Sequence, residues 1–438
     1  MVSKRKNTQG KIGPAKRLRF GLHNLRRRIG AVGAIVFVAL FFLGCNLSLP
    51  RSELDDLAIV LGVGIDVSPD DPDEVMLTLV VARAAIDGEV GQGIGINTIT
   101  SAGLTVFDAL RKVAVYRDYV LFCGHNEYIL LGEELAKRGL EKYLRVFYTD
   151  YAFQTDCPVM IVRGMTAHDF LAKQGKDVGK GIEHIVMVLR DRDMTSLYEN
   201  VHVTDIVKTT EVFPRTVLVP YVVIGNSSPL KREDEEEASV EGQHSPALEP
   251  LGDKMIPLGY AVFQHDRLQD FLDEEQMLGV NWLLHQVQSS GMVLSDSAGD
   301  RVSLDVLRSR CDIRMQKEDG QLCVVANLNV ESVLNEMFAR GGAAKDESDN
   351  AMFARMEDIQ RQMITATVNN TLQHSLQKNY DLLDLYSRVV NRHNTRWDVF
   401  TDDWEGMYPK TKFTVRVNCR ITSSFNVRDP WQEEIAKQ

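Results

Sequence analysis

Cys45 is the residue whose surroundings most clearly predict a chemical reaction. The chain begins with a basic segment, residues 1–28, which holds ten Lys and Arg side chains and no Asp or Glu. Fifteen uncharged residues follow, from Ile29 to Leu43, and a small residue, Gly44, directly precedes Cys45. These features are typical of a bacterial secretory signal peptide that ends in a lipobox. We therefore predict that residues 1–44 are cleaved off and that the Cys45 thiol takes a diacylglyceryl group.

Lipidation at Cys45 would anchor the mature chain to the outer face of the cytoplasmic membrane. Acyl chains such as palmitate give a stable anchor when at least two are present, because each buried methylene contributes roughly 0.8 kcal/mol. About nine residues, 46–54, separate Cys45 from the first predicted strand. This short tether would hold the folded part of the chain within about 30 Å of the bilayer.

An uncleaved transmembrane helix is the alternative to a lipid anchor. The uncharged stretch extends to Pro50 and so approaches the ~20 residues that a membrane span requires, although Asn46 and Ser48 make its last turn polar. Either anchor leaves the bulk of the chain outside the cytoplasm, because the basic cluster stays on the cytoplasmic side.

The rest of the sequence offers no recognisable set of reacting groups. The common nucleophile, metalloprotease, P-loop and kinase motifs do not occur. His125, Asn126 and Glu127 have the residue types of a metal or acid–base site, but a position at a junction between a helix and a strand is the favoured interpretation. We predict no catalytic, cofactor-binding or metal-binding residue, and therefore no enzyme. The other candidates are interpreted as exposed positions: His265, Asp381, Asp384, Asp402 and Asp403.

The cysteines do not indicate a disulfide framework. Lipidation of Cys45 leaves five of the six cysteines, and their spacing contains no CxxC pair and no Cys/His ligand set. Buried thiols are the favoured interpretation. Cys311 and Cys323 flank a glycine-containing turn, however, and a bridge between them is the alternative.

The charge of the chain excludes nucleic acid as a partner. Without the ten positive charges of residues 1–28, the formal net charge changes from −11 to about −21. Nucleic-acid affinity depends mainly on the neutralisation of phosphates by Lys and Arg. An acidic protein without a basic stripe is a poor candidate for such binding.

The 438 residues exceed what one hydrophobic core usually organises, so we expect two or three domains. An N-terminal α/β domain is predicted over residues 45–225. Residues 226–252 are rich in acidic residues, Ser, Gly and Pro, and are predicted to be a solvated loop or linker. A middle domain over 253–345 and a C-terminal helix-plus-strand domain over 346–438 complete the division.

Apolar periodicity and turn residues predict the main elements. Thr105 and Asp108 have the spacing of a capping box, which predicts the start of an amphipathic helix. The remaining predictions are a strand pair over 57–66 and 75–82, a hairpin over 256–263 and 267–272, a long helix over 351–390 whose inward residues include Met363, and a strand over 412–427.

Several stretches resemble the Ger(x)C family of spore germination lipoproteins. Cys45 followed by Leu54–Asp66 (LDDLAIVLGVGID) is similar to the opening of the family. The other similar stretches occur in the family's order: Leu104–Leu110 (LTVFDAL), Gly132–Gly139 (GEELAKRG), Gly259–Phe263 (GYAVF) and the region from Leu376 to Trp404.

The resemblance implies an α+β fold of three mixed α/β domains, with a long amphipathic helix packed on a sheet in the C-terminal domain. It implies a lipid-anchored subunit of a nutrient germinant receptor at the spore inner membrane. This subunit would assemble with two integral membrane partners, one of them transporter-like, and would sense or relay the germinant without catalysis. Whether it binds a small-molecule germinant itself stays open. Only the lipidation position transfers as a site residue, to Cys45.

Two other classes of protein compete with this interpretation. A lipid-anchored solute-binding protein of a nutrient importer would have two similar lobes, joined by hinge strands around a ligand pocket. An anchored hydrolase would bring a nucleophile and a base together in a cleft.

Overall fold

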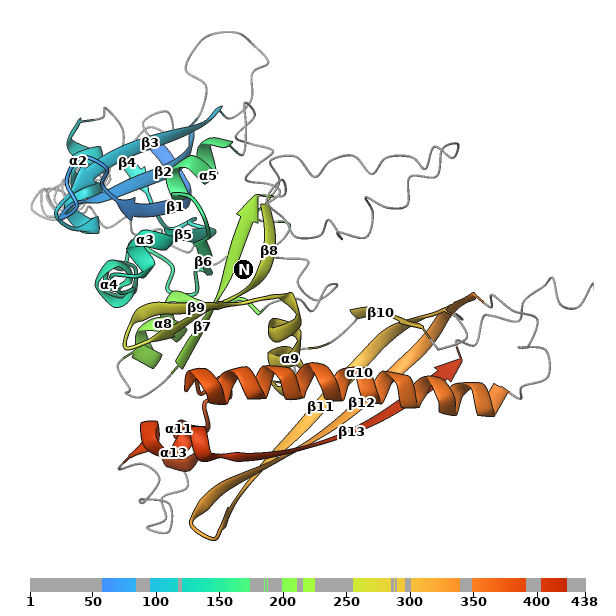
Figure 1. The fold of residues 1–438 in the computed structure, drawn as a ribbon. Helices are drawn as coiled ribbons and strands as arrows, with labels where there is room; N and C mark the ends of the chain where they lie inside the picture. The colour runs from blue at the N-terminus through green and yellow to red at the C-terminus, as the bar shows by residue number, and fades with distance from the viewer. Residues whose placement is uncertain are drawn as a thin grey trace, which may run out of the picture. The chain divides into compact units, whose positions relative to one another are not determined.

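The computed structural model describes residues 57–83, 95–116, 120–173, 185, 187, 199–210, 216–224, 255–284, 287, 290–295, 301–338, 349–390 and 403–423. The predicted signal peptide, Cys45 and the acidic segment 226–252 lie outside these residues. The described part is a mixed α/β structure built on two sheets (Figure 1). The predicted α+β class is therefore confirmed.

The elements follow one another along the chain in two groups. The first group is β1 (Leu57–Val67), β2 (Val75–Arg83), β3 (Gly95–Gly103), α2 (Val106–Tyr116), β4 (Val120–Phe122), β5 (Tyr128–Gly132), α3 (Glu133–Ala136), α4 (Glu141–Thr149), β6 (Val159–Val162), α5 (Ala167–Lys173), α8 (Val203–Thr210), β7 (Thr216–Ile224), β8 (Met255–Gln264) and β9 (Arg267–Leu272). The second group is α9 (Glu274–Leu284), β10 (Ser290–Ser295), β11 (Arg301–Glu318), β12 (Gln321–Phe338), α10 (Asp349–Lys378), α11 (Leu385–Val390), α13 (Trp404–Met407), the 3₁₀ helix η5 (Tyr408–Lys410) and β13 (Lys412–Ser423).

The first sheet has nine strands in the order β3-β2-β1-β5-β6-β7-β8-β9, and β4 pairs with the start of β1. Its central strands β1, β5, β6 and β7 run parallel, whereas the outer strands pair antiparallel. Parallel strands are normally buried on both faces, and every residue of β5 and β6 is buried. The apolar runs of the sequence therefore form the middle of the sheet.

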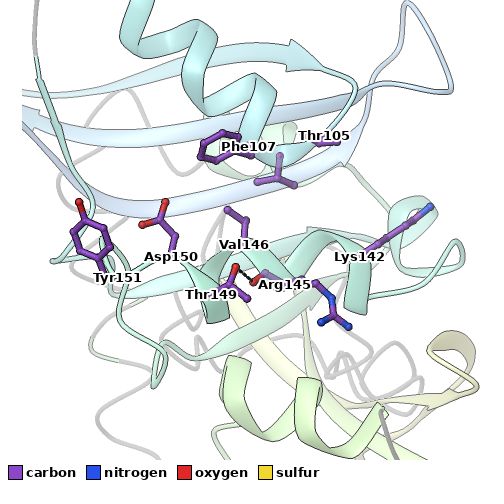
Figure 2. A pocket seen from close by; sticks show the side chains of 9 residues that line it. Thr105, Phe107, Lys142, Arg145, Val146, Thr149, Asp150 and Tyr151 are labelled. Atoms are coloured by element: carbon purple, nitrogen blue, oxygen red, sulfur yellow. Dashed lines mark hydrogen bonds between the residues drawn. The ribbon is translucent and has the colours of Figure 1, made fainter.

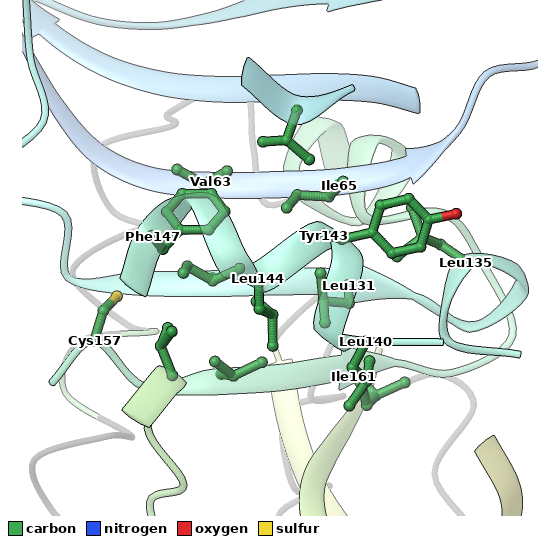
Figure 3. Packing of buried hydrophobic residues seen from close by; sticks show 14 of the residues in the cluster. Val63, Ile65, Leu131, Leu135, Leu140, Tyr143, Leu144, Phe147, Cys157 and Ile161 are labelled. Carbon is green, nitrogen blue, oxygen red and sulfur yellow. The ribbon is translucent and has the colours of Figure 1, made fainter. Parts of the chain in front are cut away.

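Helices cover both faces of the first sheet. On one face, Leu144 and Phe147 of α4 join a cluster with Leu131 of β5 (Figure 3). Successive strand residues point to opposite faces, so Leu130 joins a second cluster with Phe170 of α5. Full burial of a side chain such as Phe170 stabilises the fold by roughly 1.5–3 kcal/mol.

Both predicted hairpins of the first sheet are confirmed. β1 pairs with β2 and places Ile65 opposite Leu77, and β8 pairs with β9. The turn between β8 and β9 consists of His265 and Asp266, with φ of 50° and 66°. Positive φ at both central residues is the form of a two-residue turn that matches the twist of a hairpin.

The second sheet has four strands in the order β10-β11-β12-β13. β11 and β12 form a long hairpin, and Asp319 and Gly320 in its turn adopt φ of 48° and 79°. The Asp-Gly sequence favours this turn because both residues tolerate positive φ. β13 pairs parallel to β12, and α10 lies in the crossover that such a pair requires.

The helix α10 packs on this sheet, as predicted. Val368 and Leu372 share a buried cluster with Leu328 of β12. Met363, which was predicted to face inward, is 45% exposed, and Ile364 takes the buried position beside it.

The predicted helix over 351–390 is wrong in its length. α10 ends at Lys378, and Asn379 then adopts a φ of 58°. A left-handed residue terminates many helices, and Asn tolerates this conformation better than most residues. A separate short helix, α11, follows.

The strands do not follow the predicted limits between domains. β7 and β8 stand on either side of residues 226–252, yet they pair with each other in the first sheet. β11 and β12 belong to the predicted segment 253–345, yet they share a sheet with β13 of the segment 346–438. Each sheet thus draws strands from both sides of a predicted limit, because strands pair in space and not in sequence order. The division into domains itself stays a prediction.

No disulfide joins Cys311 and Cys323, so the alternative of a bridge is wrong. In the β11–β12 hairpin, Cys323 lies opposite Gln316 and Cys311 lies opposite Leu328. This register keeps the two thiols apart, whereas a disulfide needs Cα atoms within about 7 Å. The interpretation as buried thiols is confirmed for Cys123, Cys157, Cys311 and Cys419, and Cys323 is partly buried.

Two buried carboxyl groups cap helices. Asp66, at the end of β1, accepts hydrogen bonds from the N–H groups of Ala167 and His168 at 2.7 and 2.9 Å, at the start of α5. Asp381 accepts bonds of 2.9 and 2.8 Å from the first two N–H groups of α11. Burial raises the pKa of each carboxyl to about 6, and the backbone hydrogen bonds offset only part of this rise.

These pKa values predict that acidification stabilises the protein between pH 7 and pH 5. The ordinary pKa of an Asp carboxyl is 3.8, so the folded state binds protons in this range that the unfolded chain does not bind. The resulting stabilisation is complete below about pH 4 and is lost as the pH rises through about 6. Urea titrations should give a free energy of unfolding that is higher at pH 5 than at pH 7, by on the order of 1–2 kcal/mol.

The double variant Asp66→Asn/Asp381→Asn should lose most of this dependence on pH, and the remainder comes in part from Asp266, whose pKa burial also raises. Asp70→Asn is the control, because Asp70 is exposed and its removal leaves both buried carboxyls in place. A pH dependence that persists unchanged in the double variant would show that other groups cause it.

Gly279 allows α9 to approach α10 closely. A Cβ at this position would overlap the side chain of Thr371 and lie 3.1 Å from the carbonyl oxygen of Thr367. Alanine favours a helix over glycine by about 1 kcal/mol, but the overlap would force the two helices apart, and overpacking costs roughly 1–3 kcal/mol. We expect Gly279→Ala to lower the free energy of unfolding by about 1–2 kcal/mol in urea denaturation of the full chain in detergent.

Gly291→Ala is the matched control, because a Cβ on Gly291 in β10 meets no atom within 4 Å. This variant should unfold at the same urea concentration as the parent, or at a slightly higher one. Equal stability of the two variants would mean that α9 and α10 do not depend on a close approach at Gly279.

Candidate functional site

A surface pocket forms where the start of α2 meets one side of α4. The predicted start of α2 is confirmed: Thr105 Oγ1 accepts a hydrogen bond from the Asp108 N–H at 3.0 Å. The Asp108 carboxylate accepts a bond from the Leu104 N–H at 3.1 Å, one residue before the N–H that a capping box uses. Lys112 adds an ion pair to Asp108 at 3.1 Å. These bonds fix the first turn of α2, which carries Phe107.

A residue from the β8–β9 turn positions α4. The Asp266 carboxylate accepts hydrogen bonds from the N–H groups of Leu140 and Glu141, both at 2.8 Å. The backbone carbonyl of Asp266 accepts a further bond from the Leu140 N–H at 2.9 Å. A carboxylate at a helix start satisfies N–H groups that have no partner within the helix and complements the helix dipole. The side of α4 that lines the pocket is therefore held by a contact distant in sequence.

The pocket has a volume of about 600 Å³ and is lined from both helices (Figure 2). On α4, the four lining residues recur at the spacing of one helix face. Tyr151, just beyond the end of α4, is fully exposed, and Phe107 is 46% exposed. The lining residues are Thr105, Val106, Phe107, Lys142, Arg145, Val146, Thr149, Asp150 and Tyr151.

The pocket combines apolar side chains with positive charge and lacks a reacting pair among its lining residues. Lys142 and Arg145 supply the positive charge, and Arg145 also pairs with Glu141. The Thr149 hydroxyl donates to the carbonyl of Arg145 at 3.0 Å, and no imidazole or thiol lines the pocket. An exposed aromatic group beside cations suits the recognition of another surface, because aromatic and Arg side chains dominate protein interfaces.

The candidate side chains from the sequence lie elsewhere. His125 Nε2 lies 3.4 Å from the Glu127 carboxylate, as their spacing suggested, but the imidazole is exposed and only one carboxylate faces it. His265 lies in the predicted turn, 3.6 Å from Glu405. Within the described ranges, no three His, Cys, Asp or Glu side chains converge on a common metal position.

The interpretation of Asp381 as an exposed position is wrong. Its side chain is 3% exposed, because it is enclosed between the end of α10 and the start of α11, which it caps. Asp403 is exposed and accepts a hydrogen bond from the Gly406 N–H at 3.1 Å. Asp402 lies outside the described residues.

Cys45 also lies outside the described residues, so its lipidation stays a prediction. In the part of the chain that the structure describes, no helix has both the length and the apolar composition needed to cross a bilayer.

Two family models match the chain in the order that the resemblance predicted. The model described as spore germination protein N-terminal domain matches residues 50–224. The model described as spore germination B3/GerAC like, C-terminal, matches residues 258–424. The chain therefore belongs to the GerAC family of spore germination proteins.

Individual relatives are similar over most of the chain. Spore germination protein KC of Bacillus subtilis (strain 168) is 22% identical over 390 residues, which cover 85% of this chain and 90% of the relative. Putative spore germination protein YfkR of the same strain is 20% identical over 392 residues, with 85% and 91% covered. The crystal structure of the GerBC protein is 16% identical, covers 82% of this chain and 96% of that chain, and gives a TM-score of 0.49.

Sequence reasoning did not identify the pocket. The spacing of Lys142, Arg145, Val146 and Thr149 predicts one shared helix face, so half of the lining was accessible from the sequence. The other half, at Phe107, belongs to a different helix. Its proximity depends on how α2 and α4 pack on the sheet, which no local pattern encodes.

We expect the pocket to contribute to germination through binding. The double variant Lys142→Glu/Tyr151→Ser should slow nutrient-triggered germination of spores at least about fivefold, because loss of an interface anchor costs more than about 1 kcal/mol. Its free energy of unfolding should stay within about 0.5 kcal/mol of the parent, since exposed positions contribute little to folding.

Val293→Ser is the control for this experiment, because Val293 is an apolar residue on β10 that is 59% exposed and does not line the pocket. Immunoblots should show equal amounts of all three proteins in the spores. Equal germination rates of the parent and the double variant would exclude a role of the pocket.

Proposed function

We propose that this chain is the lipid-anchored C subunit of a nutrient germinant receptor. The observation that carries the proposal is the match of both halves of the chain, in order, to the two GerAC family models. In this role the protein senses or relays a nutrient germinant by assembling with two integral membrane subunits at the spore inner membrane, one of them transporter-like. Its work is binding and assembly, without catalysis or a cofactor.

The anchor in this proposal is lipid on Cys45. β1 begins at Leu57, as predicted, so eleven residues, 46–56, make up the tether. Fully extended, it spans at most about 40 Å. This restraint confines the folded part to a thin layer above the bilayer and raises its effective concentration towards membrane partners.

The surface where the tether enters supports a location close to the membrane. Leu57, the first residue of β1, pairs with Val120 of β4. Val120 and Phe122 are 56% and 47% exposed, and Tyr116 at the end of α2 is 80% exposed. Neighbouring exposed apolar side chains are typical of surfaces that contact a membrane or a partner. Such a surface suits the end of the protein that faces the bilayer.

The solute-binding alternative has less support than the receptor subunit. It requires two similar lobes, whereas the two sheets differ in strand number and order. The hydrolase alternative requires a nucleophile beside a base, and the lining of the described pocket contains no such pair.

Substitution of Cys45 tests the anchor. In the parent, intact mass spectrometry of the detergent-extracted protein should find a chain that begins at Cys45 and carries a diacylglyceryl group. Cys45→Ala should abolish this mass, shift the protein out of the membrane fraction or leave residues 1–44 attached, and reduce nutrient germination at least tenfold. The unfolding transition of the folded part should not change, because Cys45 precedes the first strand.

Ser48→Ala is the control, since it changes the tether three residues after the anchor and leaves the thiol in place. Normal germination with a wholly unanchored Cys45→Ala protein would refute the role of the anchor. A parent protein that retains residues 1–44 would make the chain signal-anchored and would leave the family assignment intact.

A further inference from the structure

β13 forms a long edge of the second sheet. It pairs with β12 along its whole length, from Lys412 to Ser423, and among the described strands it has no second neighbour. An unpaired edge of this length presents a row of backbone N–H and C=O groups that can accept another strand.

One hydrogen bond shows which backbone groups face this edge. The Ile421 N–H donates to the Glu357 carboxylate of α10 at 2.8 Å, and not to β12. Backbone groups of alternate residues in a strand point to the same side. The N–H and C=O groups of Phe413, Val415 and Val417 therefore point outward with those of Ile421. Glu357 occupies one end of the edge and leaves the stretch from 413 to 419 for another partner.

The helix α10 runs alongside this stretch in the opposite direction. Glu357 lies beside Ile421, and Asn369 lies beside Val415 on the lining of one groove. The twelve residue steps from Glu357 to Asn369 rise about 18 Å along the helix, and the six residue steps from Val415 to Ile421 rise about 20 Å along the strand. The helix and the strand edge therefore stay side by side over this length. The groove between them has a volume of about 550 Å³. A helix beside an open strand edge is a geometry that accepts an extended peptide by strand addition.

The charge of this groove selects the kind of strand. β13 carries Lys412, Arg416 and Arg420 and no acidic residue. Of these, Arg416 lines the groove together with Arg361 of α10, which also pairs with Asp358. A second copy of β13 would bring like charges opposite each other, which destabilises strand pairs. An extended segment with acidic side chains would instead place opposite charges together. Its end would have to stop before Ile421, because the Glu357 carboxylate already accepts the hydrogen bond of the Ile421 N–H.

We propose that the groove between α10 and β13 binds an extended acidic segment of a partner protein, which adds to the second sheet as a fifth strand beside β13. This site is separate from the pocket between α2 and α4. The proposal rests on the strand edge, the groove and its charge, and it does not depend on the proposed receptor function.

Peptide binding to the full chain in detergent tests the proposal. The probe is a fluorescein-labelled octapeptide of alternating valine and glutamate, and fluorescence anisotropy measures its binding. The parent should bind it with a dissociation constant in the micromolar range, and should bind the same peptide with lysine in place of glutamate at least tenfold more weakly. Either of two results would overturn the proposal: no binding at about 1 mM peptide, or equal binding of both peptides.

Val417→Pro removes one outward N–H and leaves the bonds between β12 and β13 in place, because proline is tolerated on the open side of an edge strand. It should weaken binding of the glutamate peptide at least tenfold. Arg361→Glu/Arg416→Glu should do the same, and it keeps the test valid if the proline variant fails to fold. Arg314→Glu, a single exposed substitution of the same kind on β11, should stay within twofold of the parent. Unchanged binding by both groove variants would overturn the proposal.

Two further results would assign the edge to another occupant. Binding that appears only in a chain ending at Ser423 would show that residues 424–438 of the chain itself fill the groove. A dimer, seen by light scattering, that Val417→Pro dissociates would show that a second copy does. Either result would overturn the assignment to a partner protein.

Discussion

The hydrogen bonds from the start of α4 to Asp266 are the constraint on which the pocket depends. Asp266 adopts a left-handed conformation that costs an L-residue roughly 1–2 kcal/mol. The two hydrogen bonds to its carboxylate oppose this strain, but burial of the carboxylate outweighs them and raises the pKa of Asp266. The same turn also reaches the end of α10, because the Gln264 amide donates to the Asn379 carbonyl at 2.8 Å. One tight hairpin therefore fixes a helix of the first sheet and contacts the segment that follows the helix of the second.

Local pattern predicted β1, β2, β8, β9 and β13 because the causes of these strands are local. The apolar run from Leu57 to Asp66 needs burial on both faces, and only a central strand offers it. Thr105 accepts a hydrogen bond from the Asp108 N–H, and Asp108 accepts one from the Leu104 N–H, so the bonds at the start of α2 are all local and the sequence predicts them. The same holds for Asp319-Gly320, whose turn requires positive φ at both positions. The family resemblance added a prediction that local pattern does not give, namely the order of the similar stretches along the chain.

The wrong predictions concern residues whose burial depends on a partner that is distant in the sequence. Gln360 is fully buried and donates to Ser332 Oγ at 2.8 Å, so a polar residue occupies the inward face of α10. A hydrophobic pattern does not predict a buried Gln. The pattern therefore placed Met363 on the inward face of the helix, where the structure has Ile364. The prediction of an exposed Asp381 is wrong because no nearby residue in the sequence indicates that the ends of α10 and α11 enclose it. The pocket between α2 and α4 depends on a cap supplied from more than a hundred residues away, and no local signal could reveal that.

The two candidate surfaces carry basic side chains although the chain is acidic, and the pocket lining also contains Asp150. This contrast affects how the protein would find its partners. Charges more than about 8 Å apart are largely screened at physiological salt, so Lys142 and Arg145, or Lys412 and Arg416, act only on groups in contact with them. The acidic remainder of the surface would not steer an acidic partner towards these sites from a distance. A protein that binds in this way gains little from long-range attraction and much from confinement. Under the proposed anchor on Cys45, the short tether supplies that confinement, because it keeps the folded part within about 40 Å of the membrane where partner subunits lie. The tether and the contact surfaces then have separate tasks: the first sets the rate of encounter, and the second decide which partner stays bound.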